Sequence, residues 1–239
     1  MTDLSHDLTP FSIIEAAYLL TATIPHHPGG SVFVIVVDPG VGTEREILAL
    51  KSVSNHYFVG PNNGIFGNVF SKTDIATCVN VTNKKYFHQP VSKTFHGRDI
   101  MAPVGAHITA GAPLREFGTK FNLDMLVSRP LTLHIDEKER KIECTVQYVD
   151  SFGNITTNVP LEGNQIKEGE LTFEKNHGVT FMVEGKEYKG TYQTHFGGVE
   201  KQALLFLRGS TGFLEISKNQ GDLARELGIQ TGQELSLQI

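Results

Sequence analysis

The strongest constraint in this 239-residue sequence is an apolar run, Ser31-Val-Phe-Val-Ile-Val-Val37, which ends directly at Asp38. Its β-branched and aromatic residues favour a strand, and the run is too short for a typical helix. Because successive side chains of a strand point to opposite faces, a run that is apolar at every position predicts a central strand covered on both faces.

Other segments of the first half alternate between helix and strand patterns. Apolar residues recur at helical spacing from Phe11 to Leu20, after Thr9-Pro10 as a helix start. Two short strands are predicted at Ile47–Val53 and Tyr57–Val59, and a helix rich in small residues at Ile100–Ala110. This half is therefore predicted to be an α/β domain with a central sheet.

The pattern changes after residue 113 to short strand-like runs separated by Gly, Asn, Asp and Pro turns, with one short helix at 223–227. Such spacing favours a small sandwich or barrel. We place the boundary between residues 120 and 130, which gives an α/β domain at 1–122 and a smaller all-β, barrel-like domain at 123–239. The predicted strands are 131–135, 141–149, 155–159, 171–173, 179–183, 203–207, 213–216 and 235–239.

Composition indicates a folded chain and excludes some partners. A hydrophobic fraction of 39% with 20% charged residues is ordinary for a globular protein. The net charge of −5 argues against a nucleic-acid partner. The N-terminus lacks a signal-peptide pattern and no stretch approaches the length of a membrane span, so we expect a cytoplasmic protein with no membrane partner. The two cysteines, Cys78 and Cys144, are expected to be buried and reduced.

Three polar loops of the first half carry residues suited to chemistry: 38–45, 60–64 and 94–99. Ligands of open α/β sheets bind beyond the carboxyl ends of strands, so these loops are expected to converge. Asp38-Pro-Gly-Val-Gly-Thr places a carboxylate at a rigid turn, beside glycines that allow close backbone approach. Arg45 is a permanent cation, and His96 is suited to act as an acid, a base or an orienter of water.

Local pattern alone leaves structural roles open for each of these residues. Asp38 is equally suited to cap a turn, Arg45 to be a solvated charge and His96 to be a structural histidine. The Gly-rich dinucleotide fingerprint and the phosphate loop are both absent, which weakens NAD and ATP as ligands. The histidines are scattered, so no metal site is predicted.

Six motifs, taken in order along the chain, resemble the S-adenosyl-L-methionine hydroxide adenosyltransferase family, relatives of the fluorinases and chlorinases. The resemblance covers almost the whole chain and implies an N-terminal α/β domain, a C-terminal β-barrel and a homotrimer with active sites between neighbouring subunits. The motifs are Asp3–Pro10, Val37–Arg45, Val59–Gly64, Thr94–Asp99, Val149–Asn158 and Gly209–Ile216.

The resemblance also implies roles for residues of the first half. Hydrolytic members hold and polarise the attacking water with an Asp, Arg and His set, which Asp38, Arg45 and His96 match. The fluorinase-like branch carries an aromatic residue in place of Asp38 and Tyr-Ser in place of His96-Gly97, so water is the expected nucleophile. Asn63, in the third motif, is expected to bind substrate.

In the second half the resemblance assigns substrate-binding roles to five residues. Phe152 and Tyr192 match the aromatic residues that flank adenine, and Asn154 matches the amide that reads the base edge. Asp150 and Ser210 match the groups that hold the methionine end, where a carboxylate and a hydroxyl suit the zwitterion.

One departure concerns the ribose. Family members begin with a strand and a Thr-Asp-Phe-Gly segment whose Asp binds the ribose hydroxyls, whereas this sequence opens at the part that follows. Either the sequence is truncated before this part, or the protein has lost part of its ribose site and with it some activity; an unpaired sheet edge is expected as well. The resemblance implies hydrolysis of S-adenosyl-L-methionine to adenosine and L-methionine without a cofactor. The alternatives are an impaired adenosine or S-adenosylmethionine binder and a halide-dependent adenosyltransferase.

Overall fold

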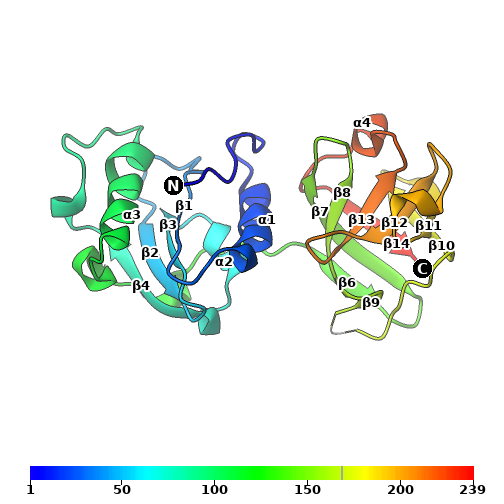
Figure 1. Ribbon diagram of the computed structural model, residues 1–239, viewed down its shortest axis with the longest axis horizontal. Helices are drawn as coiled ribbons and strands as arrows, with labels where there is room; N and C mark the ends of the chain where they lie inside the picture. The colour runs from blue at the N-terminus through cyan, green and yellow to red at the C-terminus, as the bar shows by residue number, and fades with distance from the viewer. Residues whose placement is uncertain (168) are drawn as a thin grey trace. The chain divides into compact units, whose positions relative to one another are not determined.

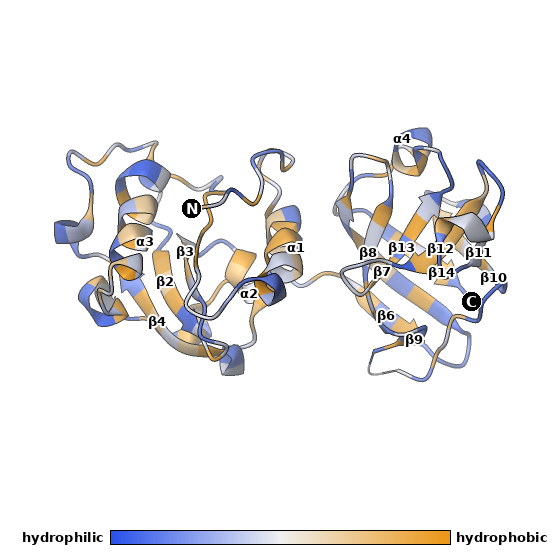
Figure 2. Ribbon diagram, viewed as in Figure 1, coloured by the Kyte–Doolittle hydropathy of each residue, from blue (hydrophilic) through white to orange (hydrophobic). Residues whose placement is uncertain are grey.

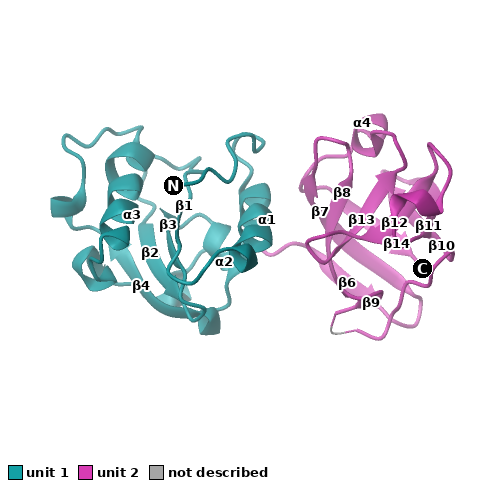
Figure 3. Cartoon of the chain, viewed as in Figure 1, with its two compact units in different colours: residues 1–129 teal, residues 130–239 magenta. Residues whose placement is uncertain are grey.

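The structure is a computed structural model that describes residues 1–167 and 169–239. The chain forms two compact units, residues 1–129 and 130–239, which Figure 3 distinguishes by colour and which we describe separately. Among the described residues, no helix has the length and apolar character needed to cross a membrane.

The first unit contains a five-stranded mixed sheet. The first pair of strands in its spatial order is parallel, and the other pairs are antiparallel. In that order the strands are β1 (Val32–Val34), β3 (Tyr57–Pro61), β2 (Ile47–Ser52), β4 (Ile75–Val81) and β5 (Gly118–Lys120).

Helices cover both faces of this sheet because the side chains of its central strands alternate between two cores (Figure 1). In β2, Leu48 and Leu50 pack with α1 and α2, whereas Ile47 and Ala49 pack with α3. Figure 2 shows the apolar character of these central strands. The helices are α1 (Ile13–Thr23), α2 (Ile65–Val69) and α3 (Ala102–Thr109).

Short helical turns connect the main elements. A π-helical turn at Gly97–Met101 runs directly into α3, so the predicted helix at 100–110 begins earlier than expected. The 3₁₀ turns are Ile24–His26, Lys72–Asp74, Lys84–Tyr86, Leu114–Glu116, Leu123–Met125 and Phe196–Gly198.

The second unit is a closed β-barrel, as the sequence predicts. Closure occurs because the first and last strands of the series pair with each other, β7 with β8. In order, the strands of the barrel are β7 (Lys141–Val149), β14 (Glu234–Gln238), β10 (Gly178–Val183), β11 (Lys186–Tyr192), β12 (Leu204–Arg208), β13 (Phe213–Lys218) and β8 (Ile155–Glu162). Two short strands extend the sheet: β6 (Leu133–Asp136) pairs with β7, and β9 (Gln165–Ile166) pairs with β8.

The barrel interior is one apolar core to which α4 (Leu223–Leu227) contributes Leu223 and Ala224. Cys144 lies in this core and Cys78 in the core of the first unit, and both are free and buried, as predicted. Burial raises the pKa of each thiol to about 12. Both cysteines are therefore unreactive thiols near neutral pH.

Two predictions from the apolar pattern are wrong. The run at 31–37 forms an edge strand, not a central one: among the described residues β1 pairs only with β3, and Val34 and Val36 are exposed. The predicted strand at 171–173 is only an isolated bridge between Thr172 and Gln165, and residues 171 and 173 have no regular secondary structure. Apolar character alone cannot distinguish a strand with two neighbours from one at an edge.

Candidate active site

Asp38 and Arg45 form a tight ion pair at the end of the segment that continues β1. The Arg45 Nε donates to both carboxylate oxygens of Asp38, at 2.9 and 3.1 Å, and the Arg45 Nη2 donates to Asp38 Oδ2. The Asp38 side chain is 6% exposed and that of Arg45 is 11% exposed. A forked pair shielded from water fixes the orientation of the carboxylate far better than a surface pair does.

His96 joins this pair through the same guanidinium. Arg45 Nη2 lies 2.9 Å from His96 Nδ1. Arginine has no acceptor, so Nδ1 accepts this hydrogen bond and the proton of the neutral ring is on Nε2. Burial and the nearby Arg45 charge lower the pKa of His96, against opposing effects of Asp38 and Asp99. The imidazole is therefore neutral near pH 7, with an N–H available on its far side.

Glycines allow the two loops to approach closely enough for these contacts. A side chain at Gly42 would place its Cβ 2.7 Å from the Lys93 carbonyl oxygen, and the φ of +80° at Gly42 is itself unfavourable for other residues. A Cβ at Gly97 would collide with the Val36 side chain. Glycine at these positions brings His96 against the segment that carries Asp38.

Asp99 is a site residue that the sequence analysis passed over, although it lies in the Thr94–Asp99 motif. Its carboxylate is fully buried and accepts the Ser92 N–H at 2.8 Å and two bonds from Arg98. These donors, Arg98 first, lower the pKa of Asp99 to about 2. Asp99 thus anchors both ends of the loop that carries His96.

Asn63 braces the backbone beside Asp38. Its side-chain Nδ2 donates to the Val37 backbone carbonyl at 2.9 Å, and the backbone carbonyl of Asn63 accepts a hydrogen bond from Arg129 Nε at 3.1 Å. Since β1 and β3 are parallel, the loops after their carboxyl ends lie at one edge of the sheet. The three polar loops of the first half therefore meet.

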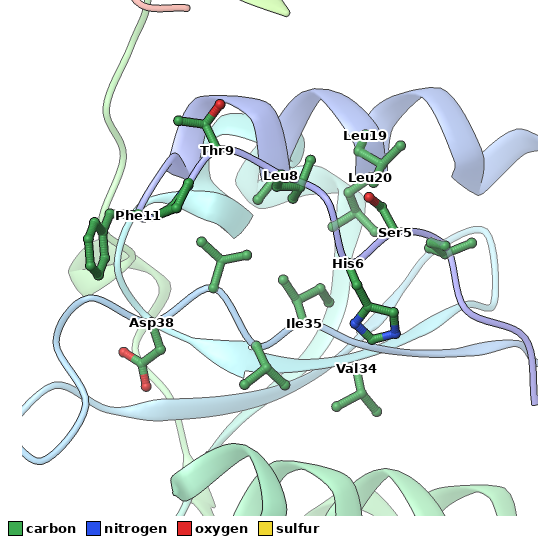
Figure 4. A pocket seen from close by; sticks show the side chains of 15 residues that line it. Ser5, His6, Leu8, Thr9, Phe11, Leu19, Leu20, Val34, Ile35 and Asp38 are labelled. Carbon is green, nitrogen blue, oxygen red and sulfur yellow. The ribbon is translucent and has the colours of Figure 1, made fainter. Parts of the chain in front are cut away.

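A cavity of about 490 Å³ reaches Asp38 along the open side of β1. Figure 4 shows the N-terminal segment from Leu4 to Phe11 and helix α1 on one side, and the segment from Val34 to Asp38 on the other. The lining is mostly apolar, with Asp38 at one end. Among the described residues, no group of three or more His, Cys, Asp or Glu side chains could hold a metal ion.

In the second unit, the predicted residues from Asp150 to Asn154 form the turn between β7 and β8. The Asp150 carboxylate accepts from the backbone N–H groups of Phe152 and Asn154 and from Asn154 Nδ2, each at 2.9 Å. These bonds hold the turn rigid and leave Phe152 75% exposed at its tip. An aromatic ring held in solvent by a rigid turn is suited to stacking with a ligand.

Phe152 and Asn154 line a cavity of about 630 Å³, but Tyr192 does not. Tyr192 is 3% exposed, and its ring stacks on Phe173 in the barrel core, with ring centroids 5.2 Å apart. The structure thus brings together two of the three residues predicted to contact adenine.

Ser210 is exposed on the turn between β12 and β13, near a carboxylate that the sequence analysis missed. A Cβ added at Gly209 would lie 3.1 Å from Glu215 Oε2. Burial, together with the charge of Asp150, raises the pKa of Glu215, against a hydrogen bond from Ser217. Glu215 therefore lies close to Gly209, the neighbour of Ser210, and within electrostatic range of Asp150, and it belongs to the Gly209–Ile216 motif.

Two family models match the chain, the SAM hydroxide adenosyltransferase N-terminal domain at residues 1–118 and the corresponding C-terminal domain at residues 144–236. The chain belongs to the SAM hydroxide adenosyltransferase family.

Its relatives include hydrolases and halogenating enzymes. The (R)-S-adenosyl-L-methionine hydrolase of Methanocaldococcus jannaschii is 34% identical over 98% of this chain and 81% of the relative. A fluorinase of Nocardia brasiliensis is 22% identical over 100% of this chain and 87% of the relative. The crystal structure of an uncharacterized conserved protein from Thermotoga maritima superposes with a TM-score of 0.86 at 32% identity, over 100% of this chain and 88% of that one.

Proposed function

We propose that this chain hydrolyses S-adenosyl-L-methionine to adenosine and L-methionine, with water as the nucleophile at the ribose 5′ carbon. The observation that carries the proposal is the shielded Asp38–Arg45–His96 set. Support comes from relatives named (R)-S-adenosyl-L-methionine hydrolase, which match 98–99% of the chain at 29–34% identity.

The reaction requires little covalent help from the protein. The water oxygen forms a bond to the 5′ carbon as the carbon–sulfur bond breaks, and the electron pair of that bond stays on the sulfur of methionine. We place the water where it donates a hydrogen bond to the Asp38 carboxylate and where its oxygen accepts a hydrogen bond from the His96 Nε2–H. Arg45 contacts both groups, so it fixes the geometry that an aligned displacement needs. The proton lost from water passes to Asp38 or to solvent.

Water is favoured over halide by the chemistry of Asp38. Its carboxylate, which is 6% exposed and paired with Arg45, offers only acceptor atoms, so it can orient a water proton but gives a halide no hydrogen bond. No observation in the structure favours the halide-dependent reaction or the impaired binder.

The remaining predicted residues complete the proposal. Phe152 and Asn154 would contact adenine, and Asp150 and Ser210 the methionine end, with Tyr192 supporting the base site from the core. Asn63 would act through the backbone next to Asp38. Homotrimer formation, with each active site between neighbouring subunits, and a cytoplasmic location stay predictions.

Incubation with S-adenosyl-L-methionine, followed by chromatography of the nucleosides, tests the proposal. Adenosine is expected from the wild-type protein, and Asp38→Ala should lower the rate by about 10²–10³-fold, as removal of one preorganised polar group commonly does. Adenosine affinity should be nearly unchanged. The matched control is Asp124→Ala, which removes an exposed carboxylate of the same unit. Formation of 5′-halo-adenosine in chloride, or full turnover by Asp38→Ala, contradicts the proposal.

A further inference from the structure

Two exposed aromatic rings from different loops line the cavity of the second unit. One is Phe152, on the turn between β7 and β8. The other is Phe196, which is 38% exposed on the 3₁₀ turn Phe196–Gly198 that follows β11. Exposed phenylalanines that share a concave surface are uncommon without a ligand to cover them, because each leaves apolar area in water.

The loop of Phe152 is fixed to the start of α4. The Gly153 carbonyl accepts the Ala224 N–H at 3.1 Å. Gly153 has a φ of +80°, and a Cβ there would collide with Asp222, so the turn and the helix start are in direct contact. Asp222 also lines the cavity and caps α4 by accepting the Arg225 N–H.

The loop of Phe196 is fixed to residues 219 and 220, which lie between β13 and α4. Asn219 Nδ2 donates to the Val199 carbonyl at 2.9 Å and to the Glu200 carbonyl at 3.3 Å. Gln202 Nε2 donates to the Gln220 carbonyl at 2.7 Å. Residues 218–222 therefore line the cavity and contact both aromatic loops, so the cavity is preformed.

We propose that Phe196 is the second aromatic wall of the nucleobase site, with Phe152 as the first. This inference rests on the proposed function. The cavity combines apolar rings, which stack on a planar base, with the side-chain amide oxygens of Asn154 and Asn219, which can accept a hydrogen bond from the amino group of a base. Tyr192 is already stacked in the barrel core, whereas Phe196 is open to a ligand. Phe196 thus contributes to the selection of an adenine nucleoside.

Calorimetry with adenosine on the full chain tests this role, using Phe196→Leu, which keeps apolar bulk but removes the ring. Loss of one stacking partner should weaken adenosine binding about tenfold. Phe196→Tyr keeps the ring and should recover most of the affinity. Met182→Leu, at an exposed position of β10, is the matched control for a surface change in the same barrel. Thermal unfolding of each variant checks that the barrel is intact.

The outcomes separate the inference from the function on which it rests. If the wild-type protein binds adenosine and Phe196→Leu binds it equally well, Phe196 is not a wall of the site. If Phe196→Tyr binds as weakly as Phe196→Leu in a folded protein, the ring is not what matters and the inference fails. If the wild-type protein binds neither adenosine nor S-adenosyl-L-methionine, the proposed function fails first and the inference with it.

Discussion

The two units present their candidate residues in opposite ways. In the first unit, Asp38, Arg45 and His96 are bonded to one another and shielded, with exposures of 6% and 11% for the Asp38 and Arg45 side chains. In the second unit, Phe152 stands 75% exposed on a turn whose polar atoms are satisfied locally. The polar side chains of the first unit are thus held in place by one another, whereas the aromatic ring of the second unit is exposed.

This difference matches what the two proposed roles, catalysis and base binding, require. Charged groups that stabilise a transition state are most effective when they are already oriented and removed from water. A ring that recognises a base must remain uncovered until the base stacks on it. Changes in the first unit should therefore alter turnover, and changes in the second should alter affinity.

After Asp38→Ala, the largest effect that tests this contrast between turnover and affinity is expected from Arg45→Lys. Lysine keeps the charge but cannot donate to both Asp38 and His96 in a fixed plane, so the water-holding geometry is lost. We expect kcat to fall by about 10²-fold, the usual consequence of small misplacement of reacting groups. Adenosine affinity, measured by calorimetry, should change little. A parallel loss of affinity would mean that Arg45 contacts the nucleoside.

The second prediction concerns Phe152→Leu, which removes the exposed ring from the rigid turn. Adenosine binding and KM should worsen by about tenfold, since each stacked base contributes on the order of 1–3 kcal/mol. The rate at saturating substrate should stay close to that of the wild-type protein. A fall in kcat with unchanged KM would contradict the division of roles between the units.

The local structures behind this division could be predicted from residue type, whereas the roles of the residues came from the family resemblance. The run before Asp38, the glycines of its loop and the turn from Asp150 to Asn154 are contiguous, so their strand, loop and turn character follows from residue type. Three polar loops after strands or before a helix also predicted a common site, and the structure brings Asp38, Arg45 and His96 into contact.

Features that depend on tertiary pairing could not be predicted in this way. The edge position of β1 depends on which strands pair, and β4 and β11 were missed because polar residues interrupt their apolar pattern. The burial of Tyr192 and the exposure of Phe196 are decided by barrel closure, which places one ring inside and the other on a loop. Asp99 was passed over because its partners, Ser92 and Arg98, become meaningful only once the loop is folded.

A smaller effect is expected from Asp99→Asn, which tests whether the His96 loop is preorganised. The asparagine cannot accept from Ser92 and Arg98 with the strength of a carboxylate, so His96 should be less well placed and kcat should fall by less than about tenfold. The Asp99 charge raises the pKa of His96, so its removal should also move the acid limb of the kcat profile to lower pH. A merely structural role would lower kcat without moving that limb, and Asp124→Asn serves as the exposed control.

The last prediction concerns the pH dependence of the wild-type protein. Burial and Arg45 lower the pKa of His96 from its ordinary 6.5, so the ring stays neutral to a lower pH than a free histidine does. Protonation would put a hydrogen on Nδ1 facing the Arg45 guanidinium and break their hydrogen bond. Activity should therefore be lost as the pH falls through a midpoint below 6.5, measured as kcat against pH.

Stability should change in the same direction over that range. The unfolded chain binds a proton at His96 between the lowered pKa and 6.5 while the folded chain does not, so acidification through this window favours unfolding. His96→Asn keeps a polar acceptor near Arg45 but cannot titrate, and it should lack this acid limb in its remaining activity. If the acid limb of the kcat profile has an unchanged midpoint in His96→Asn, the titration belongs to another group. His96 would then not set the pH range of activity.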